Sequence, residues 1–353
     1  MAFYTSIRQF RAFSAALPRF IARGLVSRLV RWDTGSLPTH PASNTMSMEL
    51  VINGLSKTYP NGVQALKNVS LTIPTGMFGL LGPNGAGKST LMRTLATLQE
   101  ADAGSARMGD VDVLKDKDAV RRQLGYLPQD FGVYPKVSAW ELLNHLAELK
   151  GLSNKRERQQ VVNGLLHKTN LFEVRFKALG GFSGGMRQRF GIAQALIGYP
   201  KLIIVDEPTA GLDPEERVRF HNLLAEIGEQ VIVILSTHIV SDVSDLCPNM
   251  AIINKGEVLL NGQPNELTQR LNGRIWAASV TRGDLASAKQ QYPVISTRLI
   301  AGKTRIHVIG ERQPGSHFEA VAPSLEDTYF AAIGGHLRNG TADAAADSAA
   351  AST

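Results

Sequence analysis

Hydrophobic and polar positions follow a regular alternation of patterns along residues 46–269. Uninterrupted apolar runs are typical of strands that are buried on both faces of a parallel sheet. Three such runs stand out: Met77–Leu81, Leu202–Val205 and Val231–Leu235. Helical patterns at Ser89–Leu98 and Pro214–Glu229 follow the first two runs. This alternation predicts an α/β fold with a parallel-sheet core.

Two smaller parts interrupt the alternation. Short β-type runs at Glu49–Ile52 and Val69–Ile73 precede the first buried strand and predict an antiparallel β subdomain. Between the first two buried strands, the periodicity of apolar residues predicts helices at Ala139–Lys150 and Lys155–Leu166. Within Asn254–Gln263 we expect two short strands around a glycine turn, after which the domain ends at residue 269.

A second unit, residues 273–335, is predicted to form a small α+β domain with a helix at Asp284–Gln291. Its strand-like segments are Arg274–Val280, Val294–Ile300 and Thr304–Ile309. A last helix is expected to begin at the N-cap Ser324, because Glu326 and Asp327 place acids in its first turn. A unit of about 60 residues buries too little apolar surface to be stable alone, so we expect it to dock on a larger body.

The N-terminal extension, residues 1–45, carries most of the net charge. Six of the 38 Lys and Arg residues are arginines among the first 32 residues, and the remaining 32 nearly balance the 31 Asp and Glu. This balance argues against nucleic-acid binding by the folded body. The extension has three interpretations: a membrane-surface amphipathic segment, an organelle transit peptide, or a start assigned too early, ahead of Met46 or Met48. Residues 341–353 contain only Ala, Asp, Ser and Thr, and are predicted to be a disordered tail.

Cysteine usage and hydropathy narrow the class of protein further. A single cysteine, Cys247, excludes an internal disulfide and suits a reducing compartment. No stretch approaches the ~18 to 20 apolar residues that a membrane-spanning helix needs. We therefore expect no membrane span in this chain.

The first chemical motif lies between the run Met77–Leu81 and the helix that follows it. Residues 82–90 read GPNGAGKST, which fits the phosphate-binding pattern GxxxxGK[ST] in the context of strand, loop and helix. Backbone N–H groups of such a loop and the positive end of the helix together bind phosphate oxygens. The residues expected to bind nucleotide are Gly82, Pro83, Asn84, Gly85, Ala86, Gly87, Lys88, Ser89 and Thr90. Lys88 is expected to reach the β- and γ-phosphates, and the hydroxyl of Ser89 to ligate Mg²⁺.

The second motif is the acidic pair that ends the buried run Leu202–Val205. Carboxylates are costly to bury without a charge partner. Alone, Asp206 would cap a turn and Glu207 would be solvated. Beside a phosphate loop, we interpret Asp206 as a Mg²⁺ ligand and Glu207 as the general base that activates the attacking water.

At this point the chain resembles a known family, the ATP-binding cassette (ABC) ATPases. FSGGMRQR, residues 182–189, is similar to the signature segment of that family, usually written LSGGQ. Four further family motifs occur in the expected order: Tyr59, Gln129 in LPQD, GLDP at residues 211–214, and His238 in STHIV. The resemblance covers residues 59–238 and implies a P-loop nucleotide-binding domain with a helical signature subdomain.

The resemblance also assigns roles. It implies that Tyr59 stacks on adenine, that Gln129 lies at the metal, and that His238 donates to the γ-phosphate. It places Ser183, Gly184 and Gly185, with Asp213, at the nucleotide of a partner subunit. Two signature positions depart from the usual wording, since Phe182 replaces Leu and Met186 replaces Gln. The second change removes an amide that can hydrogen-bond near the partner's nucleotide.

A chain with one phosphate loop and one signature cannot complete such a shared site alone. The resemblance therefore implies a homodimer or a sister ATPase subunit, with ATP and Mg²⁺ bound between the two. The ending SLEDTYF, residues 324–330, resembles that of the ATPase subunits of ABC-2 type exporters. This implies an ATPase on the cytoplasmic face of a membrane, bound to a separate polytopic permease.

Other classes of function remain. The main alternative is a soluble ABC ATPase that acts as an assembly or signalling switch without cargo. A DNA-repair ATPase of the same superfamily is disfavoured because no heptad array lies between Lys88 and Asp206. A catalytically silent binding module is disfavoured by the presence of both Glu207 and His238.

Overall fold

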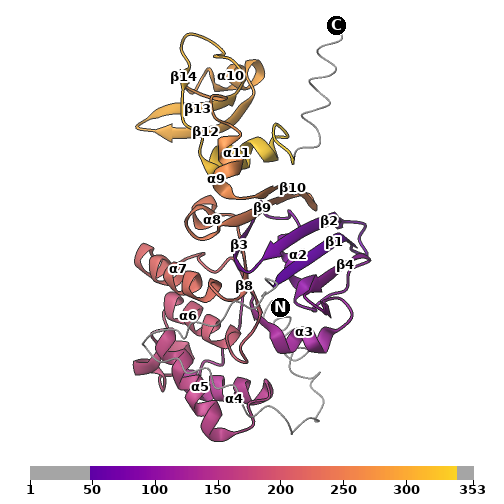
Figure 1. Cartoon of the computed structure of the whole chain (residues 1–353). Coiled ribbons are helices and arrows are strands. Elements are labelled where there is room, and N and C mark those ends of the chain that lie inside the picture. The colour runs from indigo at the N-terminus through magenta and orange to yellow at the C-terminus, as the bar shows by residue number, and fades with distance from the viewer. Residues whose placement is uncertain (1–47, 340–353) are drawn as a thin grey trace, which may run out of the picture.

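The computed structural model describes residues 48–339 and contains three β-sheets with helices around them. Figure 1 shows a body that holds the first two sheets, with a smaller lobe at the top that holds the third. Residues 1–45 and 341–353, for which the sequence predicts an N-terminal extension and a C-terminal tail, lie outside the described residues. None of the described helices is long and apolar enough to cross a membrane.

A four-stranded antiparallel sheet forms the β subdomain, with strand order β2-β1-β4-β5. Its strands are β1 (Glu49–Thr58), β2 (Gln64–Pro74), β4 (Ala103–Met108) and β5 (Val111–Asp112). The two strands predicted here are confirmed, and both are longer than their apolar runs. Antiparallel pairing carries each of them past its apolar residues into the turn at Tyr59–Val63.

The central sheet has six strands in the order β10-β9-β3-β8-β7-β6. The strands are β3 (Gly76–Leu81), β6 (Leu124–Leu127), β7 (Leu202–Asp206), β8 (Ile232–Thr237), β9 (Asn249–Asn254) and β10 (Glu257–Gly262). All neighbours are parallel except β10, which is antiparallel to β9. The carboxyl ends of β3, β6, β7 and β8 therefore meet at one edge, where the predicted site residues follow them.

The helices of the body are α2 (Lys88–Leu95), α3 (Lys117–Gln123), α6 (Gly184–Ala195), α7 (Pro214–Gly228), α8 (Val240–Leu246) and α9 (Pro264–Gln269). Their apolar side chains and those of the central sheet form two buried clusters, one on each face of the sheet. The α/β prediction with a parallel-sheet core is confirmed.

A helical subdomain lies at the end of the molecule opposite the small lobe (Figure 1). It contains α4 (Ala139–Leu149) and α5 (Lys155–Lys168), and α6 packs against both. Ser138 begins α4 with a reciprocal capping box, in which Glu141 N donates to Ser138 Oγ and Ser138 N donates to Glu141 Oε2. A separate apolar core built from α4, α5 and α6 holds this subdomain together.

One strand prediction was confirmed only in part. Two strands do meet at a glycine turn, but Asn254 is the last residue of the first strand and Glu257–Gly262 forms the second, β10. The partner strand β9 lies earlier, and Lys255 and Gly256 make the turn with positive φ angles of 48° and 82°. The apolar run Met250–Ile253 was missed because its β3 partner is distant in the sequence.

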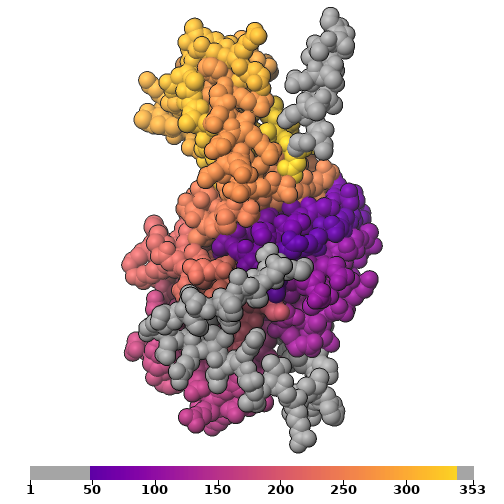
Figure 2. Space-filling view, viewed as in Figure 1, coloured from indigo at the N-terminus to yellow at the C-terminus, as the bar shows by residue number. Residues whose placement is uncertain are grey.

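The small lobe contains a four-stranded sheet in the order β12-β13-β11-β14. Its elements are β11 (Ile275–Val280), α10 (Leu285–Gln291), β12 (Val294–Ile300), β13 (Lys303–Ile309), β14 (Glu319–Ala320) and α11 (Leu325–Ile333). The space-filling view in Figure 2 shows this lobe as a separate mass above the body. The predicted strands and the predicted helix at the N-cap Ser324 are all present.

Helix α11 joins the lobe to the body, because it packs on α8, α9, β9 and β10. Leu325, Tyr329 and Ala332 belong to the same buried cluster as Leu260 and Leu267 of the body. The lobe's own core is small, with Ile306, Val308 and Phe318 among its members. Docking through α11 therefore adds the buried apolar area that a unit of this size lacks.

A buried carboxylate fastens α11 to the sheet of the lobe. Asp327 accepts hydrogen bonds from Ser324 Oγ at 2.6 Å and Ser324 N at 2.9 Å, and its Oδ1 lies 2.7 Å from His307 Nδ1 of β13. Burial acts to raise the pKa of Asp327, but the bonds from His307 and Ser324 outweigh it and hold that pKa below its ordinary value of 3.8.

Asp327→Asn is expected to lower the free energy of unfolding by about 1 to 3 kcal/mol at pH 7, since hydrogen bonds to a charged group are lost. Because the folded pKa is depressed, the carboxylate stabilises the protein above pH 3.8, and this stabilisation is lost as the pH falls through the folded pKa. Urea unfolding of the wild type and of Asp327→Asn between pH 7 and pH 3 measures the difference in their free energies of unfolding. The exposed Asp110, in the turn between β4 and β5, provides the control Asp110→Asn, which should change stability by no more than about 0.5 kcal/mol.

Candidate functional site

The loop between β3 and α2 has a backbone path that only glycine permits at two positions. Gly85 and Gly87 have positive φ angles of 78° and 108°. A methyl group added at Gly87 would collide with the carbonyl oxygen of Ala65 in β2. Because Gly87 is the residue before α2 begins, the loop delivers the chain directly into the N-terminus of that helix.

Lys88 is the first residue of α2, and its side chain folds back over the loop. It is 5% exposed, and its Nζ donates to the carbonyl oxygens of Gly82 at 2.6 Å and Pro83 at 3.2 Å. Burial lowers the pKa of Lys88, while the charges of Glu207 and Asp206 oppose that shift. The ammonium group thus lies inside the loop, 3.8 Å from Glu207 Oε1.

Ser89 and Asp206 meet from α2 and β7. The Oγ of Ser89 donates to Oδ2 of Asp206 at 3.3 Å. Asp206 is 5% exposed, and burial raises the pKa of its carboxyl. Its Oδ1 is buried and makes no hydrogen bond among the described residues; the buried hydroxyl of Ser236, also unpaired there, is close enough to act against the rise in the pKa of this carboxyl. A buried carboxylate oxygen without a donor, beside a hydroxyl, fits a hard cation that binds oxygen ligands, as Mg²⁺ does.

The metal would not be held by the protein alone. Within residues 48–339, no group of three or more His, Cys, Asp or Glu side chains is arranged to hold a metal ion. Mg²⁺ commonly binds through one or two protein oxygens, with water and substrate phosphates completing its coordination. The pair Ser89 and Asp206 at a phosphate loop fits that mode.

Glu207 lies at the centre of the polar groups. Its Oε2 accepts from Gln129 Nε2 at 3.1 Å, and its Oε1 lies 3.1 Å from His238 Nδ1. Its backbone has a positive φ of 47° and donates to Ser236 O of β8 at 2.8 Å. A left-handed backbone at a non-glycine residue costs free energy, and here it turns the carboxylate out of the sheet edge toward Lys88.

Neighbouring strands bring Gln129 and His238 to this carboxylate. Gln129 comes two residues after β6, which pairs with β7, and His238 comes one residue after β8, which pairs with β7 on its other side. Both side chains are exposed, so they are accessible to a ligand. Strand β6, which positions Gln129, was not predicted from the sequence.

Most of the phosphate loop borders one open cleft with a volume of about 630 Å³, as do Gln129 and Glu207, whereas Gly82, Asp206 and His238 do not line it. Predicted residues that line it are Tyr59, Pro83, Asn84, Gly85, Ala86, Gly87, Lys88, Ser89, Thr90, Gln129 and Glu207. Lining residues that the sequence reading missed are Val63, Gln64, Ala65, Lys67, Lys255 and Gly256. Val63 lies in the β1–β2 turn, the next three lie in β2, and Lys255 and Gly256 form the β9–β10 turn; no motif marks them in the sequence.

Tyr59 reaches the cleft from the end of β1. Its hydroxyl lies 3.1 Å from Thr90 Oγ1 and 3.2 Å from Gln99 Oε1, to which it donates. These contacts anchor the phenol on α2 and its C-terminal loop. The ring is half-buried, which leaves part of it available to a ligand in the cleft.

The signature residues and Asp213 do not line this cleft. Ser183 is the N-cap of α6, where its Oγ accepts from Met186 N at 3.2 Å. Asp213 is the N-cap of α7, where its Oδ1 accepts from Glu216 N at 2.9 Å. Ser183, Gly184 and Asp213 are exposed, whereas Gly185 is buried. The described chain thus presents two capped helix N-termini outside its own phosphate site.

The two departures from the usual signature wording have a packing explanation. Phe182 is 3% exposed in the core of the helical subdomain. Met186 is half-buried and packs against the same core. Both side chains therefore contribute to apolar packing of the helical subdomain.

Comparisons with known proteins agree on the family. Residues 66–210 match the family described as ABC transporter. The probable multidrug ABC transporter ATP-binding protein YbhF of Escherichia coli (strain K12) is 34% identical over 304 residues, which cover 81% of this chain and 52% of that protein. The uncharacterized ABC transporter ATP-binding protein YxlF of Bacillus subtilis (strain 168) is 33% identical over 300 residues, which cover 80% of this chain and 99% of that protein. The dimeric post-hydrolysis structure of the ATP-binding cassette MJ0796, bound to ADP and Pi, has a TM-score of 0.55 and 27% identity, and covers 61% of this chain and 98% of MJ0796.

The chain spans about half the length of YbhF and nearly all of YxlF. With a P-loop nucleotide-binding fold and a cleft at its phosphate loop, the protein is an ABC cassette. The chain belongs to the family of ABC transporter ATP-binding proteins.

Proposed function

We propose that this protein is the ATP-hydrolysing subunit of an ABC exporter of the ABC-2 type. The observation that supports this most directly is the carboxylate of Glu207, which contacts Gln129 and His238 and lies 3.8 Å from Lys88 at the phosphate loop. A carboxylate with these neighbours is suited to accept a proton from a water that attacks the terminal phosphate.

The residues of the loop divide the binding task. Backbone N–H groups of residues 82–90 and the N-terminus of α2 bind the phosphate oxygens. Lys88 exchanges its carbonyl partners for the β- and γ-phosphates, because a charged acceptor makes the stronger bond. Tyr59 contacts the base. Ser89 and Asp206, with Gln129, hold Mg²⁺, which when bound neutralises charge on the phosphates.

Glu207 and His238 act on the terminal phosphate. Glu207 accepts the proton of the attacking water through the oxygen that is not paired with His238. His238 donates from Nδ1–H to the carboxylate and keeps it oriented, and its Nε2 also donates to a γ-phosphate oxygen when the ring is protonated. Gln129 donates a hydrogen bond to the same carboxylate. Loss of the γ-phosphate therefore changes the contacts of Gln129, and the segment that follows it continues into the helical subdomain.

The second half of the site comes from another subunit. Ser183, Gly184 and Asp213 are exposed outside the cleft of their own chain, so they are accessible to the nucleotide of a partner, and Gly185 lies buried in the first turn of α6. The partner is a second copy or a sister ATPase subunit. The dimeric state of the MJ0796 cassette supports this arrangement. ATP then closes the dimer, and hydrolysis allows it to reopen.

The cargo pathway belongs to a polytopic permease, which holds the ATPase at the cytoplasmic face of the membrane. The similarity to the transporter ATP-binding proteins YbhF and YxlF supports a transporter, and the description of YbhF as a probable multidrug transporter protein supports a drug-like cargo. Two aromatic residues of the helical subdomain are exposed: Tyr134, in the segment after Gln129, and Phe176. Exposed aromatic side chains are suited to contact with a protein partner.

Co-purification tests the transporter assignment. The chain, tagged at its C-terminus and expressed at native level, is extracted in mild detergent, and its partners are identified by mass spectrometry. A polytopic membrane protein whose association changes with ATP is the expected result. Recovery of soluble partners alone would instead favour an assembly or signalling switch without cargo.

A further inference from the structure

One ion pair joins the second turn of the signature helix α6 to the first turn of α7. Arg189 Nη1 of α6 lies 2.6 Å from Glu216 Oε2 of α7. The side chains are 11% and 17% exposed, so water screens this pair much less than a surface pair. The family motifs place no role on Glu216, which lies between Pro214 and Arg217.

Glu216 contacts both segments that the proposed function assigns to the partner's nucleotide. On one side, a methyl group added at Gly185 would overlap its carboxylate, so the acid packs directly on the first turn of the signature helix. On the other side, its backbone N–H donates to Asp213 Oδ1 at 2.9 Å and closes the cap of α7. One residue thus touches the signature segment and the segment around Asp213.

The arginine depends on this acid. Arg189 is 9% exposed, and its Nε has no hydrogen-bond partner among the described residues. Without Glu216 its charge would be buried and uncompensated, which is strongly unfavourable. The pair therefore resists any motion that separates the start of α6 from the start of α7.

We propose that Glu216 is a positioning residue that clamps α6 to α7, so that Ser183–Gly185 and Asp213 approach the partner's nucleotide as one unit. This inference rests on the proposed function. The clamp also explains why glycine occupies position 185, because a side chain there would displace the carboxylate of Glu216.

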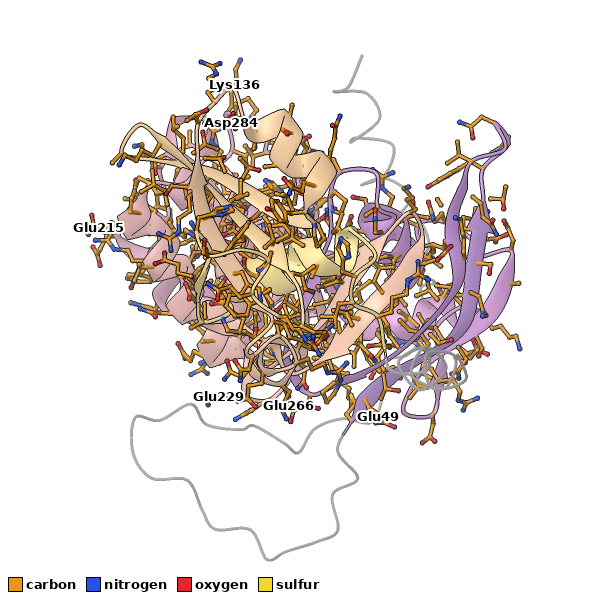
Figure 3. The ribbon with its side chains drawn as sticks, turned by 90° about the horizontal axis from the view of Figure 1, so that it is seen from above. Glu49, Lys136, Glu215, Glu229, Glu266 and Asp284 are labelled. Atoms are coloured by element: carbon orange, nitrogen blue, oxygen red, sulfur yellow. The ribbon has the colours of Figure 1, made fainter. Side chains whose placement is uncertain are left out.

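The chain provides a matched control in the adjacent acid, Glu215. Both acids lie in the first turn of α7, and both pair with Arg219. The side chain of Glu215 is 75% exposed and points away from the body in Figure 3. Glu216→Gln and Glu215→Gln therefore remove the same charge near the same helix end, but only the first removes the negative charge that pairs with Arg189.

The test measures dimer formation in the full chain. In a Glu207→Gln background, which is expected to retain ATP, the ATP concentration for half-maximal dimer is determined by sedimentation. Glu216→Gln should raise it by about tenfold, the scale of typical coupling between sites. Nucleotide binding to the monomer should stay within about twofold, since the phosphate loop is untouched. Gly184→Asp, which puts a carboxylate where the γ-phosphate approaches, should prevent dimer formation in the same assay.

Combination with Arg189→Gln separates positioning from a general loss of stability. If the two residues act as one clamp, the double variant should dimerise no worse than either single variant. Should Arg189→Gln fail to fold, Glu216→Asp, which shortens the reach to Arg189, replaces it and should show the same shift in ATP concentration. Equal shifts in Glu215→Gln and Glu216→Gln, or a fall in melting temperature without a shift, would overturn the clamp alone. Absence of an ATP-dependent dimer in the background protein itself, with nucleotide bound, would overturn the shared site and the clamp with it.

Discussion

Glu207→Gln is expected to lower ATP turnover by about 100-fold or more, while ATP remains bound. A positioned general base contributes about 10² to 10⁴ in rate, and the amide has nearly the same shape but accepts no proton. The amide still reaches Gln129 and His238, which lie 3.1 Å from the carboxylate oxygens. Phosphate release measures the turnover. Size-exclusion chromatography with light scattering measures the trapped dimer.

The control for this prediction is Glu229→Gln. Glu229 is an exposed acid at the C-terminal end of α7, and Figure 3 shows it at the edge of the body. The variant should keep wild-type turnover and form no trapped dimer. Unchanged hydrolysis in Glu207→Gln would remove Glu207 from the role of base. A loss of turnover together with a loss of nucleotide binding would assign it to the binding of ATP instead.

Lys88→Ala is expected to weaken ATP binding by about 10- to 100-fold, because hydrogen bonds from a charged group contribute about 1.5 to 3 kcal/mol. Turnover should fall by a further factor of about 100, the typical cost of removing one donor aimed at developing charge. The carbonyl oxygens of Gly82 and Pro83, which Lys88 contacts in this structure, are released by the same change. Titration with a fluorescent ATP analogue measures the binding, and phosphate release measures the rate.

An exposed lysine provides the matched control. Lys115 lies after β5, and its side chain is 84% exposed. Lys115→Ala removes the same charge and should leave both quantities unchanged. If Lys88→Ala bound ATP as tightly as the wild type, the position of the ammonium in the cleft would be incidental to phosphate binding.

Much of the fold followed from local patterns. The apolar runs that became β3, β7 and β8 are buried on both faces, so their side chains do not alternate and the strands are visible without knowledge of their partners. Helices α4, α5 and α7 were predicted to within two residues from the pattern of apolar residues. The structure adds that Ser138, Asn154 and Asp213 cap them by accepting backbone hydrogen bonds. Short strands such as β6 and β9 escaped notice, since they are stabilised by neighbours that are distant in the chain.

The candidate site divides in the same way. The order of glycines, lysine and serine in residues 82–90 identifies a phosphate loop by itself, because a phosphate site needs backbone freedom and a cation at that spacing. The sequence also identified Asp206 and Glu207 as acids at the end of a buried strand. Tertiary structure alone decided that Glu207 lies between Gln129 and His238, because their proximity depends on the order of β6, β7 and β8 in the sheet.

Tertiary structure alone also decided how the two helix N-termini relate to each other. Arg189 and Glu216 are 27 residues apart, and no pattern in the sequence pairs them. Local sequence determines caps, periodicity and loop conformation, since these depend on residues a few positions apart. Contacts between distant segments depend on the topology of the sheet and the packing of helices against it, which arise only when the whole chain is folded.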